Sequence, residues 1–311
     1  MGLVRGIPLT GSGTAFLKIA EGCNNHCSYC VIPMLRGPLV SRPEEELVEE
    51  ARFLARKGAR EIAVVAQDTT SYGLDLYKEL RLASLLRKLA AVKEVEWLRV
   101  LYLYPERITE ELLTVMAQEE KICHYLDIPV QHASDKILRA MGRASRRAGL
   151  EKLFDQIRKV LPDAALRTTF IVGFPGESDE DFDELIRFIR EQEFDWVGAF
   201  PYSLEEGTPA AQLPYQVARE VKNDRLDRLL RIQRSISLKR NRAWLGKTLT
   251  VLVERAGEKR AVGRCFRQAP EVDGVTHIRA GGLVPGVFVP IKIERVGIYD
   301  MVGRVVHEPA Q

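Results

Sequence analysis

Short apolar runs rich in β-branched residues alternate with helical patterns over residues 16–202, and this alternation limits the folds open to the chain. Six of these runs are long enough to be strands, at 16–20, 61–66, 98–104, 126–130, 166–172 and 197–202. They are apolar on both faces, as parallel strands are when helices cover them. Helical segments with acidic first turns lie between them, for example after Pro43 and after Ser178. Six successive strand–helix units predict an α/β fold with a parallel sheet and right-handed crossovers, either open or curled into a partial barrel.

The composition is that of an ordinary globular protein. The chain has 311 residues, of which 46% are hydrophobic and 29% charged. No run approaches 18 consecutive apolar residues, so we expect no membrane-spanning helix, and residues 1–21 lack the pattern of an export signal. Five cysteines are too few for a disulfide framework, and three of them fall within eight residues. This clustering predicts a cytoplasmic protein with a metal or redox site.

After residue 202 the pattern changes to one long basic helix and then to short strands. The helix is expected from about Arg219 to Leu245, and residues 219–247 carry ten Lys or Arg against three Asp or Glu, whereas the whole chain has a net charge of only +3. A solvated helix face explains such a stripe, and an anionic partner explains it about equally well. From residue 248 onward, four short runs at 248–254, 260–266, 275–278 and 287–294 alternate with glycine turns. They predict a small β-barrel, which can bind RNA or pack on a neighbouring domain.

Cys23, Cys27 and Cys30 are the strongest chemical signal in the chain. They lie in the loop after the first expected strand, at the carboxyl end of the sheet, where α/β folds place ligand sites. A disulfide does not suit a reducing compartment, and a structural zinc would need His26 or a distant residue such as Cys123 as its fourth ligand. A 4Fe-4S cluster fits better, because three cysteines leave one iron open to a substrate or cofactor.

The spacing of these cysteines, with an aromatic residue before the last one, resembles the signature of the radical SAM superfamily, and the resemblance extends over residues 16–202. It implies a partial (β/α)6 barrel and a 4Fe-4S cluster on Cys23, Cys27 and Cys30. It also implies that the open iron binds S-adenosylmethionine, which the reduced cluster cleaves to a 5′-deoxyadenosyl radical. The cofactor supplies that chemistry, while the protein supplies orientation and exclusion of water.

Further segments are similar to those of the methylthiotransferases within this superfamily. They are Ala-Glu-Gly-Cys-Asn at 20–24, Gln-Asp-Thr-Thr-Ser-Tyr-Gly at 67–73, Pro-Val-Gln-His-Ala-Ser-Asp at 129–135 and Phe-Ile-Val-Gly-Phe-Pro-Gly-Glu at 170–177. The Gln-Asp-Thr-Thr and Gln-His-Ala-Ser motifs resemble the RimO-type branch, which methylthiolates the β-carbon of an aspartate in ribosomal protein S12. The other branch acts on an adenosine in tRNA. Residues 262–264, 269–274 and 298–300 are similar to a TRAM domain, the family's C-terminal β-barrel.

The resemblance implies a domain organisation and a set of partners. We expect an N-terminal tail at 1–15, a radical SAM core at 16–215, a basic linker helix at 216–246 and a TRAM barrel at 247–311. The family also carries an N-terminal domain with three cysteines for a second cluster, whereas only 22 residues precede Cys23. We therefore expect a shortened chain, and full turnover by it alone is not expected. The implied partners are ribosomal protein S12, an electron donor such as flavodoxin or ferredoxin, and RNA at the TRAM domain, but no membrane. A tRNA substrate, or a non-catalytic docking module, remains an alternative.

Candidate contacts to the cofactor come from the family pattern and from strand ends. By the resemblance, Tyr29 lies near the adenine of S-adenosylmethionine, and packing in the loop is the alternative. Gln67 and Gln131 end expected strands, and Arg167 lies early in one. All three suit polar contacts to the methionine or ribose, although a structural hydrogen bond explains each equally well.

The last candidates are two glycines and three arginines. Gly173 and Gly176 resemble the superfamily's cofactor-facing turn, and a plain strand-to-helix turn would use the same residues. Arg225, Arg228 and Arg231 of the basic helix are candidates for docking the substrate. We assign no catalytic residue beyond the three cysteines, because removal of a hydrogen atom needs no base.

Overall fold

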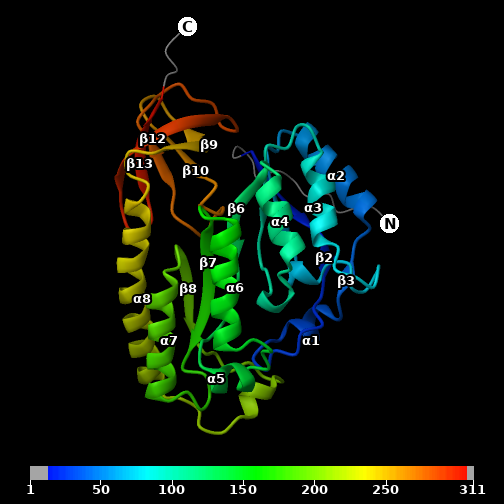
Figure 1. The fold of residues 1–311 in the computed structure, drawn as a ribbon, viewed down its shortest axis with the longest axis vertical. Helices are drawn as coiled ribbons and strands as arrows, with labels where there is room; N and C mark the ends of the chain where they lie inside the picture. The colour runs from blue at the N-terminus through cyan, green and yellow to red at the C-terminus, as the bar shows by residue number, and fades with distance from the viewer. Residues whose placement is uncertain (1–12, 307–311) are drawn as a thin grey trace.

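The computed structural model describes residues 13–306, which form a six-stranded parallel sheet and a small closed β-barrel (Figure 1). The sheet has the order β1-β4-β5-β6-β7-β8, and every neighbouring pair is parallel. Its strands are β1 (Thr14–Lys18), β4 (Glu61–Val65), β5 (Trp97–Val100), β6 (Ile122–Asp127), β7 (Ala165–Val172) and β8 (Trp196–Pro201). Because spatial order follows chain order, this is the curled, barrel-like arrangement of strand–helix units rather than a doubly wound one. The predicted partial barrel is confirmed.

Helices cover one face of this sheet and bury their apolar sides against it. They are α2 (Glu44–Arg56), α3 (Leu82–Ala90), α4 (Glu110–Gln118), α6 (Arg147–Val160) and α7 (Asp179–Gln192), together with the short α1 (Ile32–Arg36) and α5 (Asp135–Ala140) near the cysteine loop. Helix α7 begins at the expected position, because Ser178 and Asp181 form a reciprocal capping box there. A two-stranded ribbon, β2 (Ala20–Glu21) and β3 (Val40–Ser41), brackets the cysteine loop.

The two faces of the sheet differ in polarity. In β7 the residues at 166, 168, 170 and 172 are buried under the helices, whereas those at 167, 169 and 171 are partly exposed on the other, inner face. The inner face also carries Glu61 and Arg99, both fully buried. The expectation that the strands are apolar on both faces is therefore wrong for the inner face, where charged side chains pair with one another instead of packing against helices.

Two strands end earlier than the apolar runs predicted. Strand β5 stops at Val100 and not at Tyr104, and β6 occupies Ile122–Asp127 and not 126–130. The apolar segments that follow them carry Tyr102 at φ +60° and Gln131 at φ +72°, conformations that interrupt an extended ladder. These segments therefore become loops at the carboxyl end of the sheet.

The C-terminal barrel has five strands in the order β10-β11-β13-β12-β9. They are β9 (Thr248–Ala256), β10 (Ala261–Cys265), β11 (Thr276–Ile278), β12 (Phe288–Val296) and β13 (Met301–Val305). Four were predicted, while β13, which pairs with β11 and β12, was missed. The barrel has its own apolar core and sits at the end of the sheet opposite the cysteine loop (Figure 1).

Helix α8 (Arg219–Arg242) joins the two barrels, beginning where it was expected and ending three residues earlier. It lies beside α7 and β8 and reaches β12 (Figure 1). Most of the expected N-terminal tail at 1–15 lies outside the described residues, and its last two residues already belong to β1. Among the helices at 13–306, none is both long enough and apolar enough to cross a bilayer.

Candidate active site

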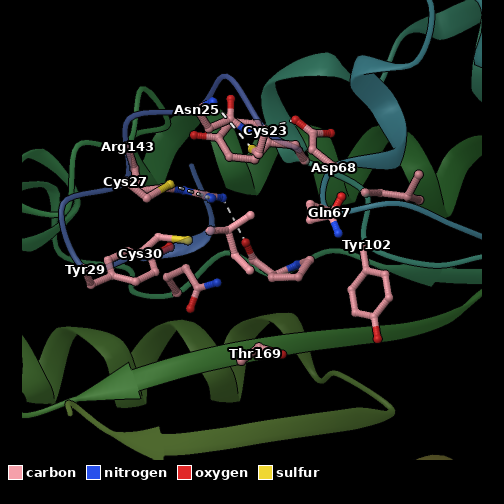
Figure 2. Close-up of a pocket in the computed structure, with 15 residues that line it drawn as sticks. Cys23, Asn25, Cys27, Tyr29, Cys30, Gln67, Asp68, Tyr102, Arg143 and Thr169 are labelled. Atoms are coloured by element: carbon pink, nitrogen blue, oxygen red, sulfur yellow. Dashed lines mark hydrogen bonds between the residues drawn. The ribbon is translucent and has the colours of Figure 1, made fainter. Parts of the chain in front are cut away.

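A cavity of about 290 Å³ lies at the carboxyl ends of β4 to β7 (Figure 2). Its walls come from the cysteine loop, from the loops after β4, β5 and β6, and from the inner face of β7. The lining residues are Cys23, Asn25, Cys27, Tyr29, Cys30, Ile32, Gln67, Asp68, Tyr102, Leu103, Tyr104, Pro129, Gln131, Arg143 and Thr169. Parallel α/β sheets place ligand sites at this edge, and the three cysteines meet there as predicted.

The cysteine loop is held in place by its backbone. Gly22 has φ +76°, and a Cβ built on it would lie 2.1 Å from the carbonyl oxygen of Pro38, so only glycine fits this position. The N–H of Cys23 donates to the carbonyl of Gly37 at 3.1 Å, and the N–H of Ser28 donates to Met141 at 2.9 Å. The loop is thereby tied to the ribbon on one side and to the end of α5 on the other.

The three thiols are free and partly buried around the cavity. Burial raises the pKa of Cys23 and of Cys30, so a metal that binds there must displace the thiol protons. Within residues 13–306, no three His, Cys, Asp or Glu side chains converge on the position of a single ion. A 4Fe-4S cluster binds its cysteines on different iron atoms, which keeps the sulfurs farther apart than the ligands of one zinc ion. Three thiols from one loop that line a single cavity are the donor set of such a cluster with one iron left open. Cys123 is packed in an apolar core beside Trp196, away from this loop.

Arg143 places a buried positive charge beside the thiols. Its Nη1 lies 4.0 Å from Cys27 Sγ, and its Nη2 donates to the carbonyl oxygen of Pro129 at 2.8 Å. The guanidinium also lies 4.0 Å from the ring centroid of Tyr104, a cation–π contact. Burial raises the pKa of Tyr29 and Tyr104, which therefore stay neutral next to it. Of these three side chains, Arg143 alone carries a charge that can balance negative charge on Cys27.

Two predicted glutamines lie in the cavity with unused acceptors. Gln67 donates its Nε2 to Glu21 at 3.3 Å. The Oε1 atoms of Gln67 and of Gln131 are buried, and neither has a hydrogen-bond partner within the described part of the chain. Unpaired buried acceptors are costly, so both atoms suit a polar ligand in the cavity. Tyr29 completes the set of predicted residues that the structure brings together here (Figure 2).

Arg167 does not line this cavity, and its expected contact with the cofactor stays a prediction. It is on the inner face of β7 but nearer the amino end of the strand. Its Nη1 donates to Asp127 Oδ1 at 2.8 Å, and its Nε lies 3.6 Å from Asp273 of the C-terminal barrel. A position within a strand does not by itself predict a place in the site. Strand β7 has eight residues, and of these Thr169 lines the cavity.

The glycine turn after β7 also lies outside the residues that line the cavity. Gly173 has φ +69°, and a Cβ there would lie 2.3 Å from Cγ of Lys222 on α8. Gly176 has φ +80° and donates its N–H to the carbonyl oxygen of Tyr215 at 2.9 Å. These glycines allow the turn to pack against the start of α8. This arrangement agrees with the alternative given in the sequence analysis, a strand-to-helix turn without a cofactor contact.

Among the three arginines of α8, Arg225 is not available for docking. It is buried and donates to Glu177 Oε1 at 2.9 Å and to Asp179 Oδ1 at 2.8 Å, which fixes α8 to the beginning of α7. Arg228 is exposed, with Asp183 at 3.5 Å, and Arg231 is exposed as well. A docking role for Arg228 and Arg231 stays a prediction.

Asp68 was not assigned a role from sequence, although it belongs to the Gln-Asp-Thr-Thr motif. Its carboxylate accepts hydrogen bonds from Asn25 Nδ2 at 2.8 Å and from Arg107 Nη1 at 2.8 Å, and it caps the short 3-10 helix Thr69–Ser71. The motif thus ties the loop after β4 to the cysteine loop. Asp68 also lines the cavity. The sequence could have indicated this, because Asp68 directly follows Gln67 at the carboxyl end of an expected strand.

Comparison with known proteins assigns the family. A model of the radical SAM superfamily matches residues 17–189, more than half of the chain, and a model of the TRAM domain matches residues 245–306. The ribosomal protein uS12 methylthiotransferase RimO of Moorella thermoacetica is 50% identical over 296 residues, which cover 95% of this chain and 68% of the relative. The chain belongs to the RimO family of radical SAM methylthiotransferases. The RimO protein of Desulforudis audaxviator is 50% identical over 300 residues, covering 96% of this chain and 67% of that one. The chain thus spans about two thirds of the length of these family members.

Solved structures agree with this family fold. Coproporphyrinogen III oxidase (HemN) from Escherichia coli, a radical SAM enzyme, has a TM-score of 0.53 at 17% identity, covering 75% of this chain and 53% of that one. The radical S-adenosylmethionine methyltransferase TsrM from Kitasatospora setae has a TM-score of 0.52 at 17% identity, covering 63% of this chain and 38% of that one. At such identities the likeness concerns the fold of the sheet and its helices alone.

Proposed function

We propose that this chain methylthiolates ribosomal protein uS12, at the β-carbon of an aspartate, as a radical SAM enzyme. Membership of the RimO family supports the substrate, and the cavity supports the chemistry. The observation that carries the proposal is the meeting of three partly buried thiols with two glutamine oxygens that have no hydrogen-bond partner among residues 13–306, at the carboxyl end of a curled parallel sheet.

The residues in the cavity would divide the binding between them. Cys23, Cys27 and Cys30 would hold a 4Fe-4S cluster. Gln67 and Gln131 would accept hydrogen bonds from S-adenosylmethionine, with Tyr29 packing beside it. When bound, the cluster and S-adenosylmethionine supply a radical able to remove a hydrogen atom from carbon.

The chain's own side chains set the surroundings of that chemistry. A C–H bond beside a carboxylate has no usable acidity at neutral pH, so removal of a hydrogen atom suits this substrate and a general base does not. Leu103 and Pro129 line the cavity with apolar surface, which limits water near a reactive centre. Arg143 sets a fixed positive charge beside Cys27 and donates no proton, because a guanidinium is not deprotonated in proteins.

Further parts of the proposal concern the cellular context. Free, partly buried thiols and a ribosomal substrate support a cytoplasmic location. Reduction of the cluster would need a donor of the flavodoxin or ferredoxin type. Contact of the C-terminal barrel with RNA stays a prediction.

The test is a single-turnover assay after anaerobic reconstitution with iron and sulfide. The chain is incubated with S-adenosylmethionine, a reductant and purified uS12, and intact-mass spectrometry follows the protein substrate. We expect cleavage of S-adenosylmethionine, and a methylthio group on one aspartate of uS12 once sulfide is supplied in the incubation as the sulfur source, with neither in the Cys27→Ala variant. If tRNA is modified in parallel incubations and uS12 is not, the proposed substrate is wrong. If S-adenosylmethionine is not cleaved at all, the chain is a docking module.

A further inference from the structure

A second cavity, of about 410 Å³, lies between the sheet, α8 and the C-terminal barrel. It opens on the same inner face of β7 as the active-site cavity. Arg167 lines the second cavity and Thr169 lines the first, and a Cβ built on Gly198 of β8 would lie 3.5 Å from the side chains of both. Neighbouring side chains on one face of a strand are about 7 Å apart, so an extended peptide could reach both cavities with residues close in its sequence.

Gln233 brings an unused acceptor to this second cavity. Its side chain is only 3% exposed. Its Nε2 donates to the carbonyl oxygen of Phe194 at 2.8 Å and to Ser237 Oγ at 3.0 Å, which fixes the orientation of the amide. The Oε1 atom is buried and has no hydrogen-bond partner among residues 13–306. A buried acceptor held in this way indicates a ligand that donates a hydrogen bond.

Two carboxylates make the rest of the cavity acceptor-rich. The side chain of Asp273 is 2% exposed, and its Oδ2 accepts from Tyr125 Oη at 2.6 Å and from the N–H of Ala269 at 2.8 Å. Asp300 is half exposed, and its Oδ1 accepts the N–H of Val275 at 2.9 Å, which leaves Oδ2 facing His277 at 3.7 Å. The cation of the cavity, Arg167, is already paired with Asp127. Arg167 Nε also lies 3.6 Å from Asp273, so Asp300 is the carboxylate of the cavity that lies beside neither lysine nor arginine among the described residues, and Asp300 Oδ2 and Gln233 Oε1 are the acceptors left for a ligand.

Two aromatic rings form one wall. The rings of Trp196 and Tyr299 are stacked, with centroids 6.4 Å apart and planes inclined by 26°. The Nε1–H of Trp196 donates to the carbonyl oxygen of Arg267, so the ring is fixed in place. Tyr299 is 46% exposed and is therefore accessible to a ligand. A Cβ on Gly274 would lie 2.2 Å from the carbonyl oxygen of Tyr299, so glycine lets this loop close against the wall. A planar cation stacks on such a surface better than an ammonium group does.

We propose that this cavity binds an arginine side chain of the protein substrate, close in sequence to the modified aspartate. The proposal rests on the proposed function for the identity of the substrate. A guanidinium matches the site because it is planar, positively charged and carries five N–H donors. A ribosomal protein is a ready source of arginine, since proteins neutralise the phosphates of nucleic acid with Lys and Arg. Gln233 Oε1 and Asp300 Oδ2 would accept its hydrogen bonds, and Tyr299 would stack on it.

The test measures binding by isothermal titration calorimetry with the full chain and three probes: N-acetyl-arginine amide, N-acetyl-lysine amide and purified uS12. The main variant is Asp300→Asn, which removes the charge and keeps an oxygen for Val275. A second variant, Tyr299→Leu, removes the stacking surface. Asp155→Asn is the matched control, because Asp155 is an exposed aspartate on α6. Thermal unfolding of every variant checks that the fold is intact.

We expect Asp300→Asn to weaken the binding of the arginine amide and of uS12 about tenfold, the effect of one charge-assisted hydrogen bond. Tyr299→Leu should weaken both, Asp155→Asn should weaken neither, and the lysine amide should bind less tightly than the arginine amide. Unchanged binding of both ligands to Asp300→Asn and Tyr299→Leu would overturn the arginine site even if uS12 is modified. Equal affinity for the two amides would overturn the guanidinium assignment. Loss of arginine amide binding in Asp300→Asn, with no binding of uS12 to any chain, would support the site and contradict the proposed substrate.

Discussion

At the scale of single residues, the candidate active site depends on three thiols that share one cavity without converging on one ion. This arrangement predicts the metal content of the protein. After anaerobic reconstitution we expect about four iron and four sulfide per chain, and loss of most of both in the Cys27→Ala variant. Colorimetric iron and sulfide assays measure this, with Cys123→Ala as the control, because Cys123 is buried in an apolar core. About one zinc and no sulfide would contradict the cluster.

Arg143 leads to a prediction about the electronic surroundings of the cluster. Its guanidinium is buried 4.0 Å from Cys27 Sγ, and a nearby positive charge stabilises the reduced, more negative state. In the Arg143→Gln variant the midpoint potential should fall by tens of millivolts, whereas Arg143→Lys should retain most of the wild-type value. A redox titration followed by electron paramagnetic resonance measures both. The control is Arg139→Gln, an exposed site on α5. A potential equal to wild type in Arg143→Gln would show that the charge is screened.

The sequence identified the residues of this site whose chemistry is local, and missed those that act through distant contacts. The cysteines are recognisable because thiols at that spacing have few other uses, and Gln67 and Gln131 because they follow strands. Arg143 lies 116 positions from Cys27 and belongs to no motif, so only the fold brings them together. For the same reason Arg225 was misinterpreted, because a stripe of charge does not reveal which member is buried in an ion pair.

At the scale of elements, the loop that presents the cysteines depends on glycine geometry. Gly22 and Gly37 have nearly the same φ, +76° and +70°. A Cβ on Gly22 would lie 2.1 Å from a carbonyl oxygen, while a Cβ on Gly37 would meet nothing within 4 Å. Gly22→Ala should therefore distort the loop and lower the iron content several-fold. Gly37→Ala should show only the cost of a left-handed alanine, about 1 kcal/mol in the free energy of unfolding, and retain its iron.

Iron analysis and chemical denaturation of the two glycine variants test this comparison. Equal iron content in Gly22→Ala and Gly37→Ala would mean that the loop adapts to the added methyl group. The outcome matters for the site because the N–H of Cys23 donates to the carbonyl oxygen of Gly37, so the two glycines lie side by side at the two ends of the segment that carries the cysteines.

The order of the elements was predictable, but several of their ends were not. Strand–helix alternation follows from hydrophobic periodicity, which is local. The ends of β5 and β6 depend on Tyr102 and Gln131, two non-glycine residues with positive φ that no local propensity predicts. Such conformations are costly and persist where the surrounding structure fixes them, and both residues line the active-site cavity. The errors in the predicted boundaries therefore fall at the candidate site.

At the scale of the whole molecule, a buried ionic network joins the sheet to the C-terminal barrel. Glu61 of β4 accepts from Arg99 of β5 at 2.7 Å and pairs with Arg264 of β10, and all three side chains are buried. Arg99 also donates to the carbonyl oxygen of Phe266 at 2.6 Å. The sequence predicted the two barrels, but not this joint, because β4 and β10 are separated by about two thirds of the chain. Since the second cavity lies at the same junction, the relative position of the barrels bears on the proposed arginine site.

The network predicts how stability depends on acid. Burial alone would raise the pKa of Glu61, but Arg264 and Arg99 outweigh burial and lower the pKa from its ordinary value of 4.5 to about 2. Glu61 therefore contributes its full stabilisation above pH 4.5, and this contribution declines as the pH falls toward 2. A difference of about 2.5 pKa units corresponds to roughly 3 kcal/mol in the free energy of unfolding. Denaturant titrations between pH 5 and pH 2 measure the decline.

The Glu61→Gln variant separates this network from other acidic groups. It should be less stable than wild type at pH 7, because two guanidinium groups lose their buried partner, and its stability should fall less between pH 4.5 and 2. Asp181→Asn is the matched comparison: the pKa of Asp181 is also lowered to about 2, through Lys136 and the capping box of α7, despite opposing burial. Loss of that carboxylate should affect α7 and leave the joint between the barrels intact. The same acid dependence in wild type and Glu61→Gln would mean that Glu61 does not govern the junction. A flatter dependence in Glu61→Gln, accompanied by earlier proteolysis between α8 and β9, would show that this carboxylate keeps the C-terminal barrel on the sheet.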